Sequence, residues 1–257
     1  MIAIGLDQER RKLEDVNHPQ HAAAVEGLSD YLTIMNLLYK SISRILESDC
    51  SLTTLQYRTL LRLLSAPQQT MRSTDLAANL RVGVSTVSAA VPHLVDNGLV
   101  TRTEDPDDMR VVSLALTRKG SSAIERADYH VGRFLQNYWR NLTPEQLEAA
   151  WASSTNAVTL HDAKRIENGK FRLDTAFFDT IMISRTLTAQ RLRELGLKTS
   201  ELRILLALYL LGPNVTASRV ADYLFLKSSD ITAPMKTLES QGHISKERSA
   251  ENRRTKL

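Results

Sequence analysis

Apolar residues recur at helical spacing over most of this chain. The stretch 28–48 places them three or four positions apart along its whole length, which is typical of an amphipathic helix. Two further stretches, 118–142 and 143–169, share the pattern and are separated at Thr143 and Pro144. Threonine caps a helix and proline fits its first turn, so the pair marks a helix start. The pattern therefore predicts a mainly helical protein.

Shorter segments lie between these long helices. The segment 53–67 begins with a capping threonine and predicts a helix, and 72–82 predicts a short second one. A third helix is predicted over 83–98, where Gly98 ends it because glycine readily takes a positive φ.

Two apolar runs, 99–104 and 111–117, follow the third helix with a charged turn between them. They predict a β-hairpin with a polar tip. Three helices followed by a hairpin form a winged helix-turn-helix, in which the third helix enters the DNA major groove.

The same pattern returns later in the chain. The segment 76–113 aligns without a gap with 220–257, and seven of the 38 pairs are identical, including Gly98 with Gly242. Further apolar positions match in type, and 174–195 supplies a second leading helix. A duplicated winged unit explains the match.

Composition narrows the class of protein. Hydrophobic residues make up 42% and aromatic residues 5% of the 257 residues, which favours helices over a β-sandwich. No long uninterrupted apolar segment predicts a membrane span, and charge begins too early for a signal peptide. The single cysteine, Cys50, excludes an internal disulfide, so we expect a cytoplasmic protein. A net charge of +4 is compatible with nucleic acid, and basic residues concentrate in 246–257.

The segment STVSAAVPHLVDNGLVTRTEDPDDMRVVSLALTRKG, 85–120, carries a family pattern. Four features occur in order: a hydroxyl-rich helix start, a Gly-Leu-Val-x-Arg strand, a D-P-x-D-x-R wing and an L-T-x-x-G motif. The chain resembles the MarR family of bacterial transcription regulators, fully over 28–168 and in degenerate form over 171–257. The resemblance implies a mostly α dimer with two winged DNA-binding lobes, often released from DNA by a small molecule or an oxidant.

We therefore expect a mainly α fold with small β-wings, in which long dimerisation-type helices join two winged helix-turn-helix domains. The expected parts are an N-terminal extension, 1–27, a first domain, 28–168, and a second, truncated domain, 169–257. The two copies would pair within one chain as a pseudo-dimer, or two chains would form a homodimer. The extension either substitutes in part for helices missing from the second copy, with a helix over 7–16, or is a frayed tail.

In the first copy, the hydroxyls of Ser85, Thr86 and Ser88 open the predicted recognition helix and can reach bases or phosphates. Ser85 can equally cap the helix. His93 and Arg102 are candidate phosphate contacts.

The resemblance implies two roles in the first wing. Arg110 matches the wing arginine that reaches into the minor groove, where narrow A/T tracts attract arginine. Asp108 matches the acidic residue that orients it. An exposed arginine that serves solubility alone is the alternative.

The second copy departs from this pattern. Its candidate DNA contacts are Ser228, Ser229, Thr232, Lys236, Lys246, Arg253 and Arg254. Asp230 stands at the place of Thr86, where a carboxylate either repels phosphate or accepts a hydrogen bond from cytosine. Asn252 replaces Asp108. Phosphate contacts should therefore outweigh base reading in this copy.

Both predicted recognition helices contain a proline. Pro92 falls inside the first, and Pro234 would be harmless only if the second began at Thr232. A proline inside a helix costs about 3 kcal/mol and kinks the helix.

The resemblance also implies an effector pocket between the long helices and the lobes. Tyr31, Met35, Leu38 and Tyr39 could line it, or could belong to a helix–helix core.

Cys50 is an unfavourable oxidant sensor, because Glu47 and Asp49 disfavour its thiolate. We expect no metal, no cofactor and no enzymatic activity, because no phosphate-binding loop, dinucleotide motif or nucleophile elbow is present.

The sequence thus predicts a transcription regulator that acts as a repressor and binds double-stranded DNA at an imperfect palindrome. The alternative is a ligand-sensing or protein-interaction module of the same fold that has lost specific DNA binding.

Overall fold

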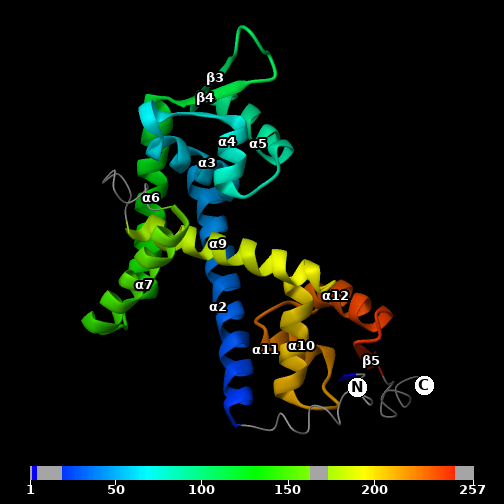
Figure 1. Cartoon of the computed structure of the whole chain (residues 1–257). Helices are drawn as coiled ribbons and strands as arrows, with labels where there is room; N and C mark the ends of the chain where they lie inside the picture. The colour runs from blue at the N-terminus through cyan, green and yellow to red at the C-terminus, as the bar shows by residue number, and fades with distance from the viewer. Residues whose placement is uncertain (1, 5–18, 163–172, 247–257) are drawn as a thin grey trace, which may run out of the picture. The chain divides into compact units, whose positions relative to one another are not determined.

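The computed structural model describes residues 2–4, 19–162 and 173–246 (Figure 1). Its helices are α2 Pro19–Cys50, α3 Thr54–Ser65, α4 Ser73–Leu80, α5 Val84–Asp96, α6 Arg118–Tyr138, α7 Pro144–Asp162, α9 Leu173–Glu194, α10 Thr199–Leu211, α11 Ala217–Tyr223 and α12 Ser228–Ser240. Its strands are β1 Ile2–Ile4, β2 Thr70–Arg72, β3 Val100–Glu104, β4 Val112–Leu116 and β5 Ile244–Lys246. The predicted fold class, helices with small β-wings, is confirmed.

Helix boundaries follow local signals. α6 and α7 are separate because Thr143 caps α7: its hydroxyl accepts a hydrogen bond from the Gln146 N–H at 3.3 Å, and the Gln146 side chain accepts one from the Thr143 N–H at 3.0 Å. α2 begins at Pro19, so part of the predicted N-terminal extension is helical. The helix predicted over 7–16 lies outside the described residues.

The chain divides into two compact units. One is Leu38–Thr186, and the other combines Met1–Leu37 with Leu187–Leu257. Each unit holds the winged lobe of one copy and the leading part of the other copy's long helix. The division by repeat, at residues 28 and 169, stays a prediction, since the compact units group the chain by contact instead.

In the unit Leu38–Thr186, α3 forms the centre of the lobe. It contacts α4, α5, α6 and β4, and nine of its twelve residues are buried. The core includes the fully buried side chains of Leu60, Leu63, Leu76, Leu80 and Leu94. Burying each such side chain stabilises the fold by roughly 2 kcal/mol. β4 lies between β2 and β3, and the β3–β4 pair runs from Val100 opposite Leu116 to Glu104 opposite Val112.

The second lobe repeats this core on a smaller scale. A cluster of eleven buried residues joins α10, α11, α12 and β5, with Ile204, Leu224 and Leu238 among them. The strand paired with β5 is β1, from the opposite end of the chain. Sequence reasoning predicted neither β1 nor β2.

Candidate nucleic-acid interface

The third helix of the first lobe, α5, has one apolar and one polar face. Its buried face consists of Val87, Ala90, Val91 and Leu94. The candidate DNA contacts on it are all exposed: Ser85, Thr86, Ser88 and His93. The helix cap is Gly83, and no side chain caps it. Ser85 therefore lies within the first turn, and the alternative of a capping role for it is wrong.

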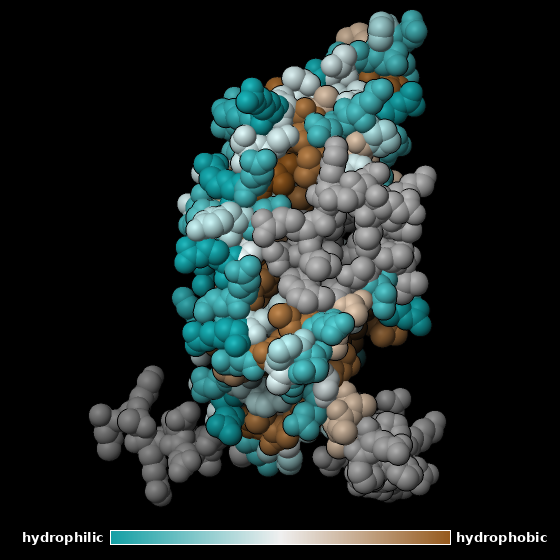
Figure 2. All heavy atoms as spheres, turned by 90° about the vertical axis from the view of Figure 1, so that its left-hand side faces the viewer, coloured by the Kyte–Doolittle hydropathy of each residue, from teal (hydrophilic) through white to brown (hydrophobic). Residues whose placement is uncertain are grey.

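The tip of the first wing is held by carboxylates. The Asp108 carboxylate accepts a hydrogen bond from the backbone N–H of Arg110 at 3.0 Å, and the Asp105 carboxylate accepts one from Asp107 at 2.9 Å. Asp108 thus fixes the backbone that carries Arg110, whose side chain is exposed. The hairpin extends from the top of Figure 1, and the corresponding upper tip is mainly hydrophilic in Figure 2.

Arg102, on β3, forms an exposed ion pair with Glu104 at 2.8 Å. Exposed ion pairs contribute roughly 0–1 kcal/mol. A phosphate can therefore replace Glu104 as the partner of this guanidinium at little cost.

The wing base is fixed by a compact corner where β4 enters α6. The Thr117 hydroxyl donates to the backbone carbonyl of Gly98 at 2.8 Å and accepts from the Gly120 N–H at 3.0 Å. Gly98 has φ +66°, and a Cβ on Gly120 would lie 2.1 Å from the Leu99 carbonyl oxygen. The L-T-x-x-G motif therefore ties the recognition helix's end to the wing, and glycine is required because the two backbones touch.

A hollow of about 340 Å³ connects α5 with the wing. It is lined by Ser73, Ser88, Val91, Pro92, Val95, Asp96, Arg102 and Val112. Two candidate DNA contacts from different elements, Ser88 and Arg102, thus border the same depression.

The second lobe presents α12 in the same manner. Its buried face consists of Ile231, Met235 and Leu238. The candidate contacts on it are exposed: Ser228, Ser229, Thr232 and Lys236. Lys246, on β5, is paired with Glu239 at 2.9 Å, and Asp230 is exposed in the first helical turn. Arg253, Arg254 and Asn252 lie outside the described residues.

Both prolines lie inside their helices. Pro92 falls within α5, and Pro234 falls within α12, which begins at Ser228. The expectation that α12 could begin at Thr232 is therefore wrong. Each helix continues past its proline, so both α5 and α12 keep their full helical length despite one missing backbone donor.

Each lobe contains a buried arginine at the equivalent position of its first helix, and neither residue was among the predicted site residues. Arg58 on α3 donates to the Leu80 carbonyl at 3.2 Å, and Arg203 on α10 donates to the Leu224 carbonyl at 3.0 Å. Both carbonyls end the second helix of their lobe, where helix oxygens lack an intrahelical donor. The signal in the sequence was the repeated Arg-x-Leu-Leu of 58–61 and 203–206.

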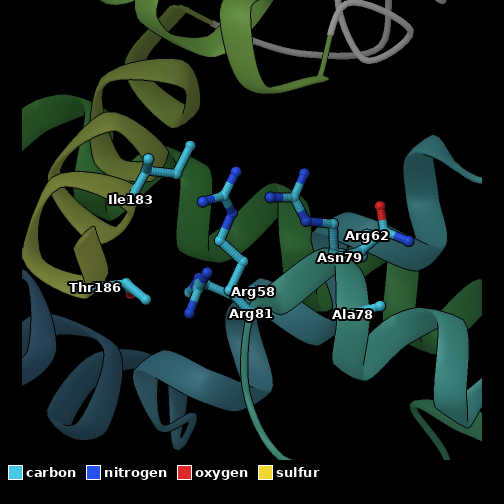
Figure 3. Close-up of a pocket in the computed structure, with 7 residues that line it drawn as sticks. All are labelled: Arg58, Arg62, Ala78, Asn79, Arg81, Ile183 and Thr186. Atoms are coloured by element: carbon cyan, nitrogen blue, oxygen red, sulfur yellow. The ribbon is translucent and has the colours of Figure 1, made fainter. Parts of the chain in front are cut away.

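A second pocket, of about 300 Å³, lies beside Arg58 (Figure 3). It is lined by Arg58, Arg62, Ala78, Asn79, Arg81, Ile183 and Thr186. Burial, and then the charge of Arg62, lowers the pKa of Arg58 to about 10, which still leaves the Arg58 guanidinium charged at neutral pH. The pocket is therefore electropositive.

The four residues predicted to line an effector pocket differ in the exposure of their side chains. Tyr31 is exposed, Met35 is half-buried and Leu38 is buried. The Tyr39 ring stacks on the Arg185 guanidinium, whose central carbon lies 3.9 Å from the ring centroid. The described lining of the arginine pocket includes none of these four, and their effector role stays a prediction.

Cys50 ends α2 and is 3% exposed. Burial, more than the opposing charge of Arg126, raises the pKa of its thiol, and Asp49 raises it further. Burial therefore keeps the group as an unreactive thiol, against the opposing charge of Arg126.

The helices and wing of each lobe define a winged helix-turn-helix of the DNA-binding class. A model described as MarR family matches residues 52–112, and a second model of the same description matches 195–255. No curated protein matches the chain. No helix in the described part of the chain is long and apolar enough to cross a membrane.

Several solved structures are similar to part of this chain. Sco3205, a MarR family transcriptional regulator from Streptomyces coelicolor in complex with DNA, is 32% identical over 47% of this chain and 76% of its own, with a TM-score of 0.42. A mutant MarR from E. coli complexed with operator DNA is 25% identical over 45% and 84%, with a TM-score of 0.38. YusO from Bacillus subtilis is 22% identical over 55% and 98%, with a TM-score of 0.44. This chain belongs to the MarR family of transcription regulators and carries its domain twice.

Proposed function

We propose that the protein is a sequence-specific repressor that binds one operator with both lobes of a single chain. The observation that carries this proposal is the second appearance of an exposed hydroxyl-bearing helix beside a wing strand with one basic residue, α5 with Arg102 of β3 and α12 with Lys246 of β5. Each helix has a buried apolar face that fixes its rotation, so its polar face points to solvent. Because the two faces differ in residues, the operator is an imperfect palindrome.

The contacts within each unit support pairing of the two copies inside one chain. In the first, α9 packs on the first copy: the Phe178 ring lies 5.7 Å from Tyr57, and Phe177 lies 4.6 Å from Trp139. In the second, the Arg203 guanidinium lies 3.5 Å from the Thr33 hydroxyl of α2. The leading helices thus exchange between copies, as elements do between two subunits of an interlocked dimer.

The arginine pocket supports a response to an anionic effector. Arg58, Arg62 and Arg81 bring three positive charges to a space large enough for a small carboxylate or phosphate, and Asn79 and Thr186 add polar groups. Because Arg58 also bonds the last turn of α4, a ligand there would act on the element that precedes α5.

The test begins with selection of random duplex DNA on the full chain. With the selected sequence, Thr86→Ala and Arg110→Ala should each weaken binding about tenfold or more, while circular dichroism stays unchanged. Arg110→Ala should also reduce the magnitude of the slope of log affinity against log salt by about 0.9, because the bound protein then brings one positive charge fewer to the DNA and releases fewer counterions.

The matched control is Arg140→Ala, which removes the same charge from an exposed position between α6 and α7. An equal loss of operator affinity in this control would contradict the assigned interface. Unchanged affinity in both Thr86→Ala and Arg110→Ala would contradict it as well.

One observation favours a second function. Asp230 places an exposed carboxylate in the first turn of α12, where it opposes phosphate. In this alternative the second lobe is an interaction or sensing module, and Asp230→Thr would leave DNA affinity unchanged rather than raise it.

A further inference from the structure

The second lobe is completed by the other end of the chain. β1 pairs antiparallel with β5, with Ile2 opposite Lys246, Ala3 opposite Ser245 and Ile4 opposite Ile244. β1 also contacts α10. The sheet of this lobe therefore joins residues at least 240 positions apart in the sequence.

The pairing has the same register as the first wing. There, Leu114, Ala115 and Leu116 of β4 lie opposite Arg102, Thr101 and Val100 of β3. The repeat places those three β3 residues over Lys246, Ser245 and Ile244. Ile2, Ala3 and Ile4 consequently occupy the places of Leu114, Ala115 and Leu116, and the sequences Ile-Ala-Ile and Leu-Ala-Leu correspond.

One further contact repeats the first lobe. β4 contacts α3, and β1 contacts α10, the counterpart of α3. Val215, at the counterpart of Met71 in β2, is likewise in a β-bridge. β1 therefore pairs with the counterpart of β3 and contacts the counterpart of α3, as β4 does in the first lobe.

We infer that β1 is the second strand of the second wing and that this lobe needs it to bind DNA. Without β1, the backbone groups of β5 on this edge would lack their partners, and a strand of three residues does not persist alone. The backbone that carries Lys246, a candidate phosphate contact, would then no longer be held by a partner strand. Ile2–Ile4 is thus a positioning segment, and the DNA part of this inference rests on the proposed function.

Cross-linking tests the position of the strand without reference to DNA. The variant Ala3→Cys/Ser245→Cys should form an intramolecular disulfide under mild oxidation, detected by mass spectrometry of the digested chain. Thr101→Cys/Ala115→Cys, the corresponding pair of the first wing, is the positive control. Ala3→Cys/Thr101→Cys is the negative control, because Thr101 is the counterpart of Ser245 in a sheet that β4 already completes. A disulfide in the positive control but not in Ala3→Cys/Ser245→Cys would overturn the inference.

DNA footprinting tests the consequence. Ala3→Pro/Ile4→Pro removes the donors of two adjacent residues, one of which must face β5. We expect loss of protection at one half-site and a fall in operator affinity of roughly 100-fold, because the two lobes then no longer bind together. Ala3→Ser/Ile4→Val keeps both donors and should bind as the parent does.

The two arms separate the possible failures. Unchanged affinity and an unchanged footprint in the proline variant would show that β1 is dispensable and would overturn the inference. Absence of DNA binding by the parent chain would contradict the proposed function, while the cross-link would still report where the strand lies.

Discussion

At the residue scale, Gly120 is the position where a single added methyl group would do the most damage to the first wing. Its missing Cβ would lie 2.1 Å from the backbone oxygen of Leu99 and 2.7 Å from the Leu116 side chain. The Leu99 backbone is held in place and cannot shift without strain. Gly120→Ala should therefore lower the free energy of unfolding by about 3 kcal/mol. Urea denaturation measures this change.

Gly27→Ala is the control for that substitution. Gly27 lies within α2 with nothing within 4 Å of an added Cβ, so alanine there should stabilise the protein by about 1 kcal/mol. Similar effects of the two substitutions would contradict the close contact at Gly120.

Cys50 gives a second prediction at this scale. Burial raises the pKa of its thiol, so the thiolate fraction at pH 7–8 is smaller than in an unfolded chain. Labelling by a thiol reagent should be at least about tenfold slower in the native protein than in denaturant, and should accelerate only as pH rises towards the raised pKa. Equally fast labelling in both states would show that the thiol is accessible and reactive.

Individual exposures could be predicted from the sequence, but individual contacts could not. Helical spacing separates the buried Val87 and Leu94 from the exposed Thr86 and Ser88. The bond from Asp108 to the Arg110 backbone depends instead on the turn of the wing tip, which periodicity does not determine.

At the scale of elements, α5 is a helix that tolerates a proline. Pro92 cannot donate to the Ser88 carbonyl one turn earlier, yet the helix continues to Asp96 because its buried face packs against α3, α4 and β3. Pro92→Ala restores the donor on an exposed position and should raise the free energy of unfolding by about 2 kcal/mol.

Thermal and urea denaturation measure the effect of Pro92→Ala. Pro106→Ala, in the turn between β3 and β4, is the control, because that proline interrupts no helix and its replacement should not stabilise the chain. A destabilised Pro92→Ala variant would mean that the kink itself is required for packing.

Long elements could be predicted because they have many periods of the hydrophobic pattern. α2, α6 and α9 each span more than five turns, and their segments were recognised with errors mainly at the ends. β1 and β2 span three residues each, too short for a pattern, and their pairing partners are distant in sequence. Strands this short form because they pair with the free edge of a neighbouring strand, and their own residues do not predict them.

At the scale of the whole molecule, the exchange of leading helices distinguishes this chain from a simple tandem of independent lobes. Each compact unit includes helix from both copies, so cutting the chain between the repeats would separate α9 from the lobe that it packs on. The duplication could be predicted from the sequence. The exchange of helices could not, because the apolar pattern of an amphipathic helix does not indicate which copy the helix will contact.

The central claim is that one chain reads one operator. The most direct measurement is the mass of the complex, by light scattering, between the full chain and a duplex selected from random sequences. We predict one chain per duplex, with an imperfect palindrome whose half-sites are about one helical turn apart. Two chains on a perfect palindrome, or no enriched sequence at low salt, would contradict this account.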